Sequence, residues 1–177
     1  RNMVLAALFA ALTAIGAFLQ IPTGTVPITL QFLFTALAGL LLGWKWGAVS
    51  QLLYVGIGLL GLPVFTQGGG IGYVLQPSFG FLLGLIPAAA VIGALTARRT
   101  GYLTVLAAVL VGDLILYAVG VPYMYLILHV YMQSAKTFPA LLAAMLVYVP
   151  GDTLKIVVVT ALAPVLRRTL VKAVPNL

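Results

Sequence analysis

The stretch "YVPGDTLKIVVVTALAPVLRR" (residues 148–168) contains the pattern that decides the fold. Asp152 and Lys155 open a run of apolar, largely β-branched residues, and the run ends at Arg167 and Arg168. The hydrocarbon core of a membrane is about 30 Å thick, and a helix of about 20 residues crosses it. The run has about this length, so we predict a membrane-spanning helix.

The composition extends this interpretation to the whole chain. The 177 residues are 63% hydrophobic and 6% charged, with a mean hydropathy of +1.22, whereas soluble domains carry about 25% charged residues. We therefore predict one integral membrane domain, residues 1–177, with several spans. The net charge of +7 is spread along the sequence, which argues against a nucleic-acid-binding patch. The absence of cysteine excludes disulfides and thiolate chemistry.

Turn-forming sequences divide the chain into apolar segments of spanning length. Six such segments are present: 2–19, 28–43, 46–61, 73–97, 102–120 and 149–167. A further apolar piece, 141–147, is too short to span, and we expect it to lie near the membrane surface. The prediction is an all-α polytopic membrane protein with six transmembrane helices and a short surface helix before the last span.

The distribution of positive charge predicts the orientation. With six spans, both termini lie on one side of the membrane, and only Lys136 lies on the opposite side. The side of the termini receives Arg1, Lys45, Arg98, Arg99, Arg167, Arg168 and Lys172. Cytoplasmic loops of membrane proteins carry an excess of Lys and Arg. We therefore predict that the N- and C-termini are both cytoplasmic.

The charged pair at the start of the last span is the strongest candidate site. Lys155 lies 12 residues before Arg167, or about 18 Å along a helix, which places it inside the span. A charge that faces lipid costs about 2.5–3.5 kcal/mol, so such residues usually face a cavity or a substrate path. The simpler alternative is that Asp152 caps the helix and forms an i,i+3 ion pair with Lys155.

Two other polar residues have less certain roles. Asp113 lies in the fifth predicted span, where it either pairs with Lys155, lines the same cavity, or makes a hydrogen bond to another helix. His129 has no His, Asp or Glu at metal-ligand spacing, so we predict no metal site. One histidine and two aspartates make a poor catalytic set, and the sequence has no P-loop motif. We predict neither an enzyme nor an ATP-binding chain.

The uncharged stretch "GLPVFTQGGGIGYVLQPSFGFLLG" (61–84) is a second candidate. Glycine permits positive φ angles and close approach of the backbone to a ligand. Irregular backbone at membrane depth is tolerated where it is buried or lines a cavity, although a flexible hairpin is the alternative. Nearby aromatic residues either wall an apolar pocket or form an interfacial belt. They are Phe65, Tyr73, Tyr117, Tyr123 and Tyr125.

The first predicted span carries small residues at every fourth position. In "AALFAALTA" (6–14), Ala6, Ala10 and Ala14 share one face, and Ala7 and Ala11 lie beside them. Small residues at this spacing let another helix approach closely. The partner helix belongs either to this chain or to another protein.

Four blocks of the sequence, in order, resemble the BioY family of biotin-specific substrate-binding (S) components of energy-coupling factor (ECF) transporters. They are "VPITLQFLFTALAGLLLG" (26–43), "YVGIGLLGLPVF" (54–65), "GGGIGYVLQPSFGFLLG" (68–84) and "YVPGDTLKIVVVTALAPVLRR" (148–168). The resemblance implies a six-helix protein of a bacterial or archaeal plasma membrane, with a vitamin pocket near the extracellular face. It also implies coupling to a transmembrane T component, contacted by Ala6, Ala10 and Ala14, and to two ATPase subunits that use ATP. No cofactor is expected in this chain.

The resemblance also suggests the ligand site. In the family, an Asp and a Lys at the start of the last helix belong to the biotin site, and they match Asp152 and Lys155. We expect further substrate contacts from Phe65, Gly68, Gly69, Gly70, Tyr73, Gln76 and Tyr117. Around Gln76, "LQPSFG" departs from the expected Gly-Pro-Thr-Gly type of segment, and Asp113 matches no family hallmark. Whether Lys155 meets the ureido carbonyl or the carboxylate of biotin stays open.

Two other functions fit parts of the sequence. One is an S component for a different vitamin, such as thiamine or riboflavin, on the same fold. The other is an ion-coupled small-molecule carrier that uses Asp113, Asp152 and Lys155 as a relay. Such carriers often contain inverted repeats, and the sequence shows no internal repeat.

Overall fold

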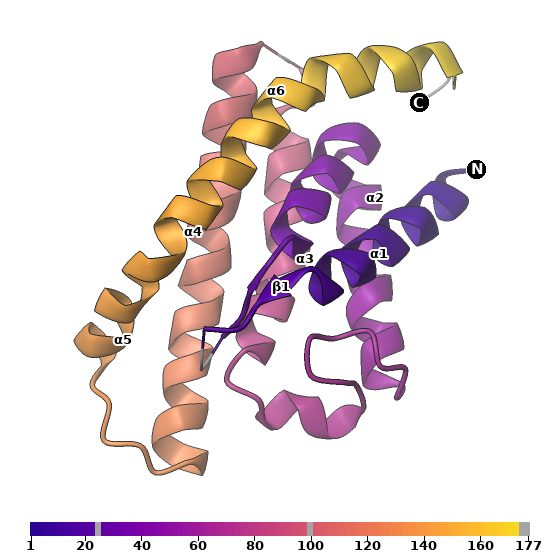
Figure 1. Ribbon diagram of the computed structural model, residues 1–177. Coiled ribbons are helices and arrows are strands. Elements are labelled where there is room, and N and C mark those ends of the chain that lie inside the picture. The colour runs from indigo at the N-terminus through magenta and orange to yellow at the C-terminus, as the bar shows by residue number, and fades with distance from the viewer. Residues whose placement is uncertain (24–25, 99–100, 174–177) are drawn as a thin grey trace.

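The computed structural model describes residues 1–23, 26–98 and 101–173, with side chains up to Thr169. Arg99 and the side chain of Lys172, which entered the charge prediction, lie outside the described residues. The chain is mostly helical (Figure 1). Its main elements are α1 (Asn2–Phe18), β1 (Gln20–Ile21), β2 (Ile28–Thr29), α2 (Gln31–Leu59), α3 (Phe79–Leu95), α4 (Tyr102–Leu126), α5 (Phe138–Met145) and α6 (Val149–Ala173).

Three short helical turns join these elements. A 3-10 turn (Ile71–Leu75) precedes α3, a π turn (Ile127–Tyr131) extends α4, and a second 3-10 turn (Leu146–Tyr148) joins α5 to α6. The strands β1 and β2 form a two-stranded antiparallel hairpin in which Gln20 pairs with Thr29. This hairpin was not predicted from the sequence.

α2 consists of two antiparallel helical legs that meet at Gly43. This residue has φ 78° and ψ 177°, a conformation that glycine adopts readily because it lacks a Cβ. The Thr35 hydroxyl donates to Gln51 Oε1 over 2.9 Å, although a straight helix would separate residues 16 apart by about 24 Å. A Cβ on Gly47 would lie 2.8 Å from the Gly39 Cα atom, so the legs pack backbone to backbone. They correspond to the apolar segments predicted at 28–43 and 46–61.

Length and apolar composition identify three membrane-crossing candidates among the described helices. They are Gln31–Leu59, Tyr102–Tyr131 and Phe138–Thr169, and the first of them is bent at Gly43. α1 and α3 are apolar but have 17 residues each. The chain is thus a mostly helical protein with candidate membrane spans.

Several predicted boundaries differ from the structure. The segment predicted at 73–97 begins as a 3-10 turn, and α3 starts only at Phe79, after Pro77, whose ring lacks an N–H donor. α4 continues past the predicted end at residue 120, because Val121 and Met124 are buried and Pro122 lies on the exposed face. A short helix is present near the segment 141–147, as predicted, but α5 begins three residues earlier, at Phe138, and ends at Met145. Its location at the membrane surface stays a prediction.

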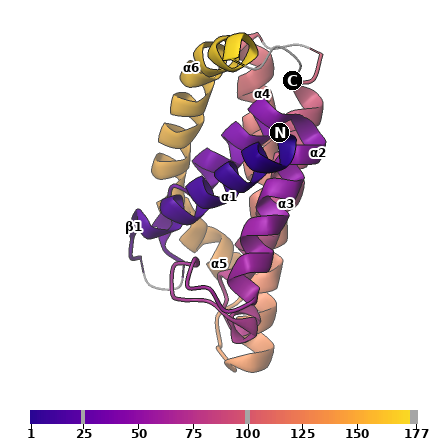
Figure 2. The same ribbon diagram turned by 90° about the vertical axis from the view of Figure 1, so that its right-hand side faces the viewer.

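The two ends of the molecule have different characters. The start of α1, the end of α6, the end of α3 and the start of α4 lie toward one end (Figures 1 and 2). At this end Arg167 Nη1 donates to the Thr96 carbonyl over 3.3 Å, which ties α6 to α3. The loop before α3 and the connection from α4 to α5 lie at the opposite end. The candidate site lies between these ends, where α6 begins.

Candidate functional site

A cavity opens where the β1–β2 hairpin meets four helices. Residues of β2, the first leg of α2, α3, α4 and α6 line it, together with Thr66, Tyr73 and Tyr148 from the connecting segments. It encloses about 630 Å³ of empty space, part of which is open to solvent. Small-molecule sites typically have mostly apolar walls with a few polar groups. The apolar part of this wall includes Phe32, Phe81, Leu82, Leu85 and Leu116.

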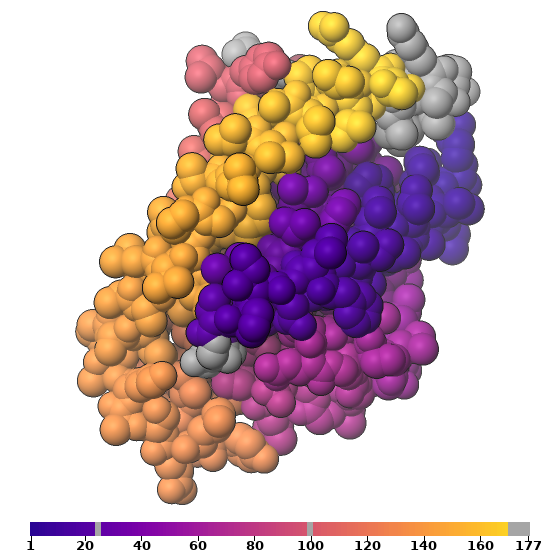
Figure 3. Space-filling view, viewed as in Figure 1, coloured from indigo at the N-terminus to yellow at the C-terminus, as the bar shows by residue number. Residues whose placement is uncertain are grey.

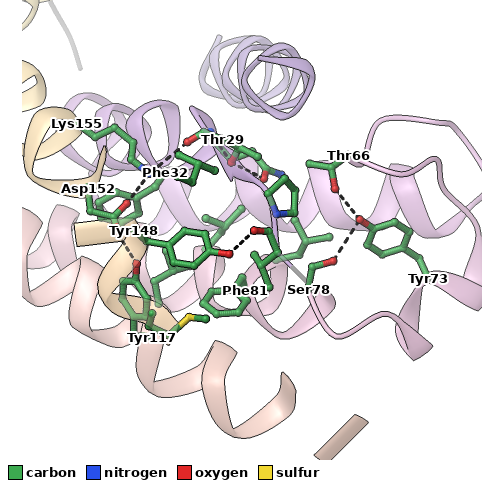
Figure 4. Close-up of a pocket in the computed structure, with 18 residues that line it drawn as sticks. Thr29, Phe32, Thr66, Tyr73, Ser78, Phe81, Tyr117, Tyr148, Asp152 and Lys155 are labelled. Atoms are coloured by element: carbon green, nitrogen blue, oxygen red, sulfur yellow. Dashed lines mark hydrogen bonds and ion pairs between the residues drawn. The ribbon is translucent and has the colours of Figure 1, made fainter. Parts of the chain in front are cut away.

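An ion pair forms one end of the cavity wall. Asp152 Oδ1 and Lys155 Nζ are 2.5 Å apart, and the two residues are 6% and 7% exposed. Lys155 Nζ also donates to the Thr29 carbonyl over 3.2 Å, and the Tyr117 hydroxyl donates to Asp152 Oδ2. Figure 4 shows these four residues converging from β2, α4 and α6. Each charge therefore has more than one polar partner.

The local sequence explains why the pair faces the cavity. Asp152 and Lys155 lie three residues apart in the first turns of α6, so their side chains emerge on the same face of the helix. Asp152 lies inside the helix, which starts at Val149, and the interpretation of Asp152 as an N-cap is therefore wrong. The i,i+3 ion pair in that interpretation is confirmed.

The electrostatics of the pair favour a neutral polar ligand group. A buried ion pair gains little net stability over an apolar pair of similar volume, because desolvation offsets the attraction. Loss of one partner, by contrast, leaves an uncompensated buried charge. Because the pair has no net charge, it offers a carboxylate acceptor and an ammonium donor side by side. A ligand that carries both N–H donors and a carbonyl acceptor complements it.

Hydroxyl groups line the opposite end of the cavity. The Tyr73 hydroxyl lies 2.9 Å from Thr66 Oγ1 and 3.4 Å from Ser78 Oγ. Figure 4 shows these three residues at the far side of the cavity from Asp152 and Lys155. Tyr73 was predicted from the sequence, but Thr66 and Ser78 were not, because their residue types are common in loops.

Other lining residues were also missed. Gln31 Nε2 donates to the Tyr54 hydroxyl over 2.7 Å, and the Thr29 hydroxyl donates to Gln31 Oε1 over 2.9 Å. The Tyr148 hydroxyl donates to the Val26 carbonyl, which holds the segment before β2 against the start of α6. Tyr148 directly precedes the segment that contains Asp152, and this proximity was an available signal. The Thr29 carbonyl offered no signal in the sequence, because every residue carries a backbone carbonyl.

The predicted substrate contacts separate into two groups. Asp152, Lys155, Tyr73 and Tyr117 line the cavity. Phe65 does not: it is 1% exposed, and its ring centroid lies 4.6 Å from that of Tyr73, behind the wall. A Cβ on Gly58 would come within 2.1 Å of the Phe65 ring, so this ring fills space beside α2. Gln76 is exposed and does not line the cavity either.

The three predicted glycines shape the loop behind the cavity. Gly68 has φ 111° and forms a bridge with Phe65, and the Gly70 amide, at φ 99°, donates to the Gly58 carbonyl over 2.7 Å. A Cβ on Gly69 would lie 2.1 Å from the Leu62 carbonyl oxygen. These contacts hold the loop against the end of α2. The glycines do not line the cavity.

Asp113 does not join the ion pair. It lies on α4, one turn before Tyr117, and does not line the cavity. Its Oδ1 atom is buried and has no hydrogen-bond partner among the described residues. Two of the alternatives left open for Asp113, pairing with Lys155 and lining the cavity, are therefore wrong, because Asp152 and the Thr29 carbonyl hold the ammonium of Lys155.

The alanine stripe of α1 packs mainly inside the chain. Ala6 is 0% exposed and Ala10 is 5% exposed, whereas Ala14 is half-buried. On the same face, Thr13 Oγ1 accepts a hydrogen bond of 3.3 Å from Gln51 Nε2 of α2. Another helix of this chain therefore occupies the face predicted for a foreign helix, and we correct that prediction.

Tyr123 and Tyr125, two of the aromatic residues considered as pocket walls, do not line the cavity.

Comparison with known proteins gives one consistent family. A model of the BioY family matches residues 1–172. A probable biotin transporter BioY of Lysinibacillus sphaericus is 54% identical over 139 residues, which cover 77% of this chain and 71% of that protein. The biotin transporter BioY of Thermotoga maritima is 35% identical over 92% of this chain and 94% of its own length.

The fold also matches a solved structure. It is the crystal structure, at 2.1 Å, of the S-component for biotin from an ECF-type ABC transporter. The match has a TM-score of 0.83 and 29% sequence identity, and it covers 94% of this chain and 90% of the other.

Proposed function

Because the chain belongs to the BioY family, we propose that it is a membrane-embedded biotin-binding subunit that mediates biotin uptake. The observation that carries this proposal is the buried pair of Asp152 and Lys155, which lines a mostly apolar cavity. Curated relatives are named biotin transporters, and the similar solved structure is the S-component for biotin. The role of the chain is thus transport, not catalysis.

The chemistry of biotin fits the cavity. Its ureido group has two N–H donors and one carbonyl acceptor, its sulfur-containing ring is apolar, and its tail ends in a carboxylate. Asp152 accepts from a ureido N–H, and Lys155 donates to the ureido carbonyl. Phe32, Phe81 and Leu82 offer apolar surface to the sulfur ring. The chain itself needs no cofactor for this binding.

An energising module would supply ATP hydrolysis. The similar structure is an S-component of an ECF-type ABC transporter, and this sequence has no P-loop motif. A transmembrane T component and two ATPase subunits are the partners that we propose. The corrected contact face on α1 carries Ala7 and Ala11, which are exposed and four residues apart. Figure 3 shows α1 lying across the surface of the molecule, where another helix can reach it.

The topology proposed for the membrane has six spanning helices. α1, the two legs of α2, α3, α4 and α6 supply them. α1 and α3 have 17 residues each, and local thinning of the bilayer accommodates helices of this length. The turn at Gly43 approaches the end of α3, since a Cβ on Gly93 would lie 2.4 Å from the Trp44 nitrogen. Lys45 follows Trp44 and Arg98 follows the end of α3 at Leu95, so both belong to the part of the molecule where α3 ends. Their charge supports a cytoplasmic location for this end.

Titration calorimetry on the purified full chain tests the proposed function. Biotin should bind with one site per chain, whereas thiamine and riboflavin should give no heat at the same concentrations. Binding of either of these vitamins without binding of biotin would contradict the proposal and favour an S component for a different vitamin.

A further inference from the structure

Three arginines belong to the junction between the last parts of α3 and α6. Arg167 Nη1 donates to the carbonyl of Thr96, the residue that follows α3, over 3.3 Å. Arg98 is two residues beyond Thr96, so the backbone keeps their Cα atoms within about 7 Å of each other. Arg168 is next to Arg167 in α6, and both Arg98 and Arg168 are exposed. We call Arg98, Arg167 and Arg168 the arginine cluster.

In the described part of the chain, the arginine cluster has no carboxylate side chain as a partner. The whole sequence contains two acidic residues. Asp152 forms an ion pair with Lys155, and no other ion pair joins side chains in the described ranges. Asp113 is 11 residues from Tyr102, the first residue of α4, or about 16 Å along the helix. Like charges that are close together repel one another, so an anion from outside the chain would stabilise the cluster.

Exposed aromatic residues mark the membrane depth of the arginine cluster. Trp44 and Tyr102 are both exposed. Tyr102 begins α4, and Trp44 lies against the last part of α3, since a Cβ on Gly93 would lie 2.4 Å from the Trp44 nitrogen. Trp and Tyr are enriched where a membrane meets water, because each has an apolar ring and one polar group. In the proposed topology, the cluster therefore lies at the depth of the lipid head groups.

The last turns of α6 change direction at this end of the molecule. Pro164 lies inside the helix, and a proline there bends a helix because it lacks an N–H donor and its ring clashes with the preceding turn. Figure 1 shows the last turns, in yellow, running across the end of the molecule, and Figure 2 shows them almost end-on. Val165 and Arg168 in these turns are exposed. This part of α6 thus presents apolar and cationic groups to its surroundings, as helices at a membrane surface do.

The donor groups of arginine suit a phosphate. The guanidinium is planar and carries five N–H donors, which bind phosphate oxygens in pairs. In the described part of the chain, the Thr96 carbonyl takes one donor of Arg167, and the other N–H groups of this guanidinium have no protein partner. Basic pockets between transmembrane helices on the cytoplasmic side of a membrane bind anionic lipid head groups.

We propose that the arginine cluster binds the phosphate of an anionic phospholipid, and that this lipid holds the last parts of α3 and α6 together. Arg98 contributes its charge from the end of α3, and Arg167 and Arg168 contribute theirs from α6. The exposed apolar side chains of Leu95 and Val165 offer surface to the acyl chains of the lipid. None of the three arginines lines the biotin cavity, so the lipid site does not depend on the ligand of that cavity.

Thermal unfolding of the full chain in detergent tests the lipid site. The probes are phosphatidylglycerol, which is anionic, and phosphatidylcholine, which has no net charge, added in equal amounts. A ligand that binds only the folded state raises the unfolding midpoint. At about ten times its Kd, phosphatidylglycerol should raise the midpoint by about 3–6 °C more than phosphatidylcholine does.

The double variant Arg98→Gln/Arg168→Gln should lose most of this difference between the two lipids. Both positions are exposed, and the variant keeps the contact of Arg167 with Thr96, so it should fold as the parent does. Its affinity for biotin, measured by calorimetry, should equal that of the parent.

Matched controls separate the location of the charge, its geometry and the source of the phosphate. Lys136→Gln removes an exposed cation from the connection between α4 and α5, at the opposite end of the molecule, and should keep the full difference. Arg98→Lys/Arg168→Lys retains both charges without the planar donor groups and should keep part of it. Inorganic phosphate at the concentration of the lipid should leave the midpoint unchanged.

Three results would overturn the lipid site. Equal midpoints of the parent with the two lipids would show no preference for an anionic head group. A double variant that keeps the full difference would place the bound lipid elsewhere on the protein. A rise with inorganic phosphate as large as that with phosphatidylglycerol would make the cluster a site for a soluble anion. None of these results bears on biotin binding, so the proposed function is tested separately.

Discussion

The Asp152 carboxylate and the Lys155 ammonium lie 2.5 Å apart on one face of α6, each more than nine-tenths buried. Their partners come from outside this helix: Tyr117 of α4 donates to the carboxylate, and the Thr29 carbonyl of β2 accepts from the ammonium. The pair therefore joins three elements that are distant in sequence. Any change at one member is expected to alter the ligand cavity and also the packing around it.

Replacement of Lys155 by Ala should weaken biotin binding strongly. The change removes a charged donor and leaves Asp152 without its counter-charge. Hydrogen bonds to charged groups contribute about 1.5–3 kcal/mol, so we expect a loss of about ten- to a hundredfold in affinity. Calorimetry on the variant measures this loss, with Lys45→Ala as the matched control far from the cavity. If Lys155→Ala and Asp152→Asn both bind biotin as the parent does, the site lies elsewhere.

Replacement of Tyr117 by Phe tests the hydrogen bond that Tyr117 donates to the carboxylate of Asp152. The phenolic hydroxyl donates to Asp152 Oδ2, and its removal leaves one carboxylate oxygen without this partner. The expected loss of biotin affinity is about threefold to thirtyfold, which corresponds to about 0.7–2 kcal/mol. Tyr123→Phe is the control, because the hydroxyl of Tyr123 bonds to the Val74 carbonyl, and Tyr123 does not line the cavity. Equal affinities in the two variants would contradict a ligand-site role for Tyr117.

Replacement of Gly43 by Ala should destabilise the protein without changing the lining of the cavity. The positive φ of 78° at Gly43 is costly for a residue with a Cβ, and we expect a loss of about 1–3 kcal/mol. The loss should appear as a lower midpoint of thermal unfolding in detergent. Gly56→Ala serves as the control, since it lies within a helical leg and a Cβ there meets no atom within 4 Å. Equal unfolding midpoints for the two variants would show that the turn does not need glycine.

Two alanines of α1 should respond differently to replacement by Trp. Ala7 is exposed, so Ala7→Trp should keep the fold and biotin binding but block co-purification with a T component. Ala10 is 5% exposed, so Ala10→Trp should overpack the contact with the rest of the chain and lower stability by about 1–3 kcal/mol. Co-expression with the energising module and affinity purification measures the first effect, and thermal unfolding measures the second. An Ala7→Trp variant that assembles normally would place the docking surface elsewhere.

The sequence by itself determined the class of the protein and the most informative pair of residues. A charge content of 6% in an apolar chain leaves a membrane as the only suitable surroundings, and this conclusion needs no coordinates. The i,i+3 spacing of Asp152 and Lys155 fixes their proximity on any helix, because the helical repeat places such residues on one face. The turn-forming residues that follow Leu42 are also a local signal, and they predicted the apolar segments 28–43 and 46–61 as separate helices.

Only the tertiary structure decided what these helices face. Ala6 and Ala7 are adjacent and chemically identical, yet one is buried and the other exposed, because the packing of α1 on α2 selects the face. Phe65 and Tyr73 are both aromatic residues of one loop, but only Tyr73 reaches the cavity. The Thr29 carbonyl and Lys155 are 126 residues apart in the chain and still form a hydrogen bond. Such contacts depend on how distant segments of the chain pack, and local residue patterns do not determine that packing.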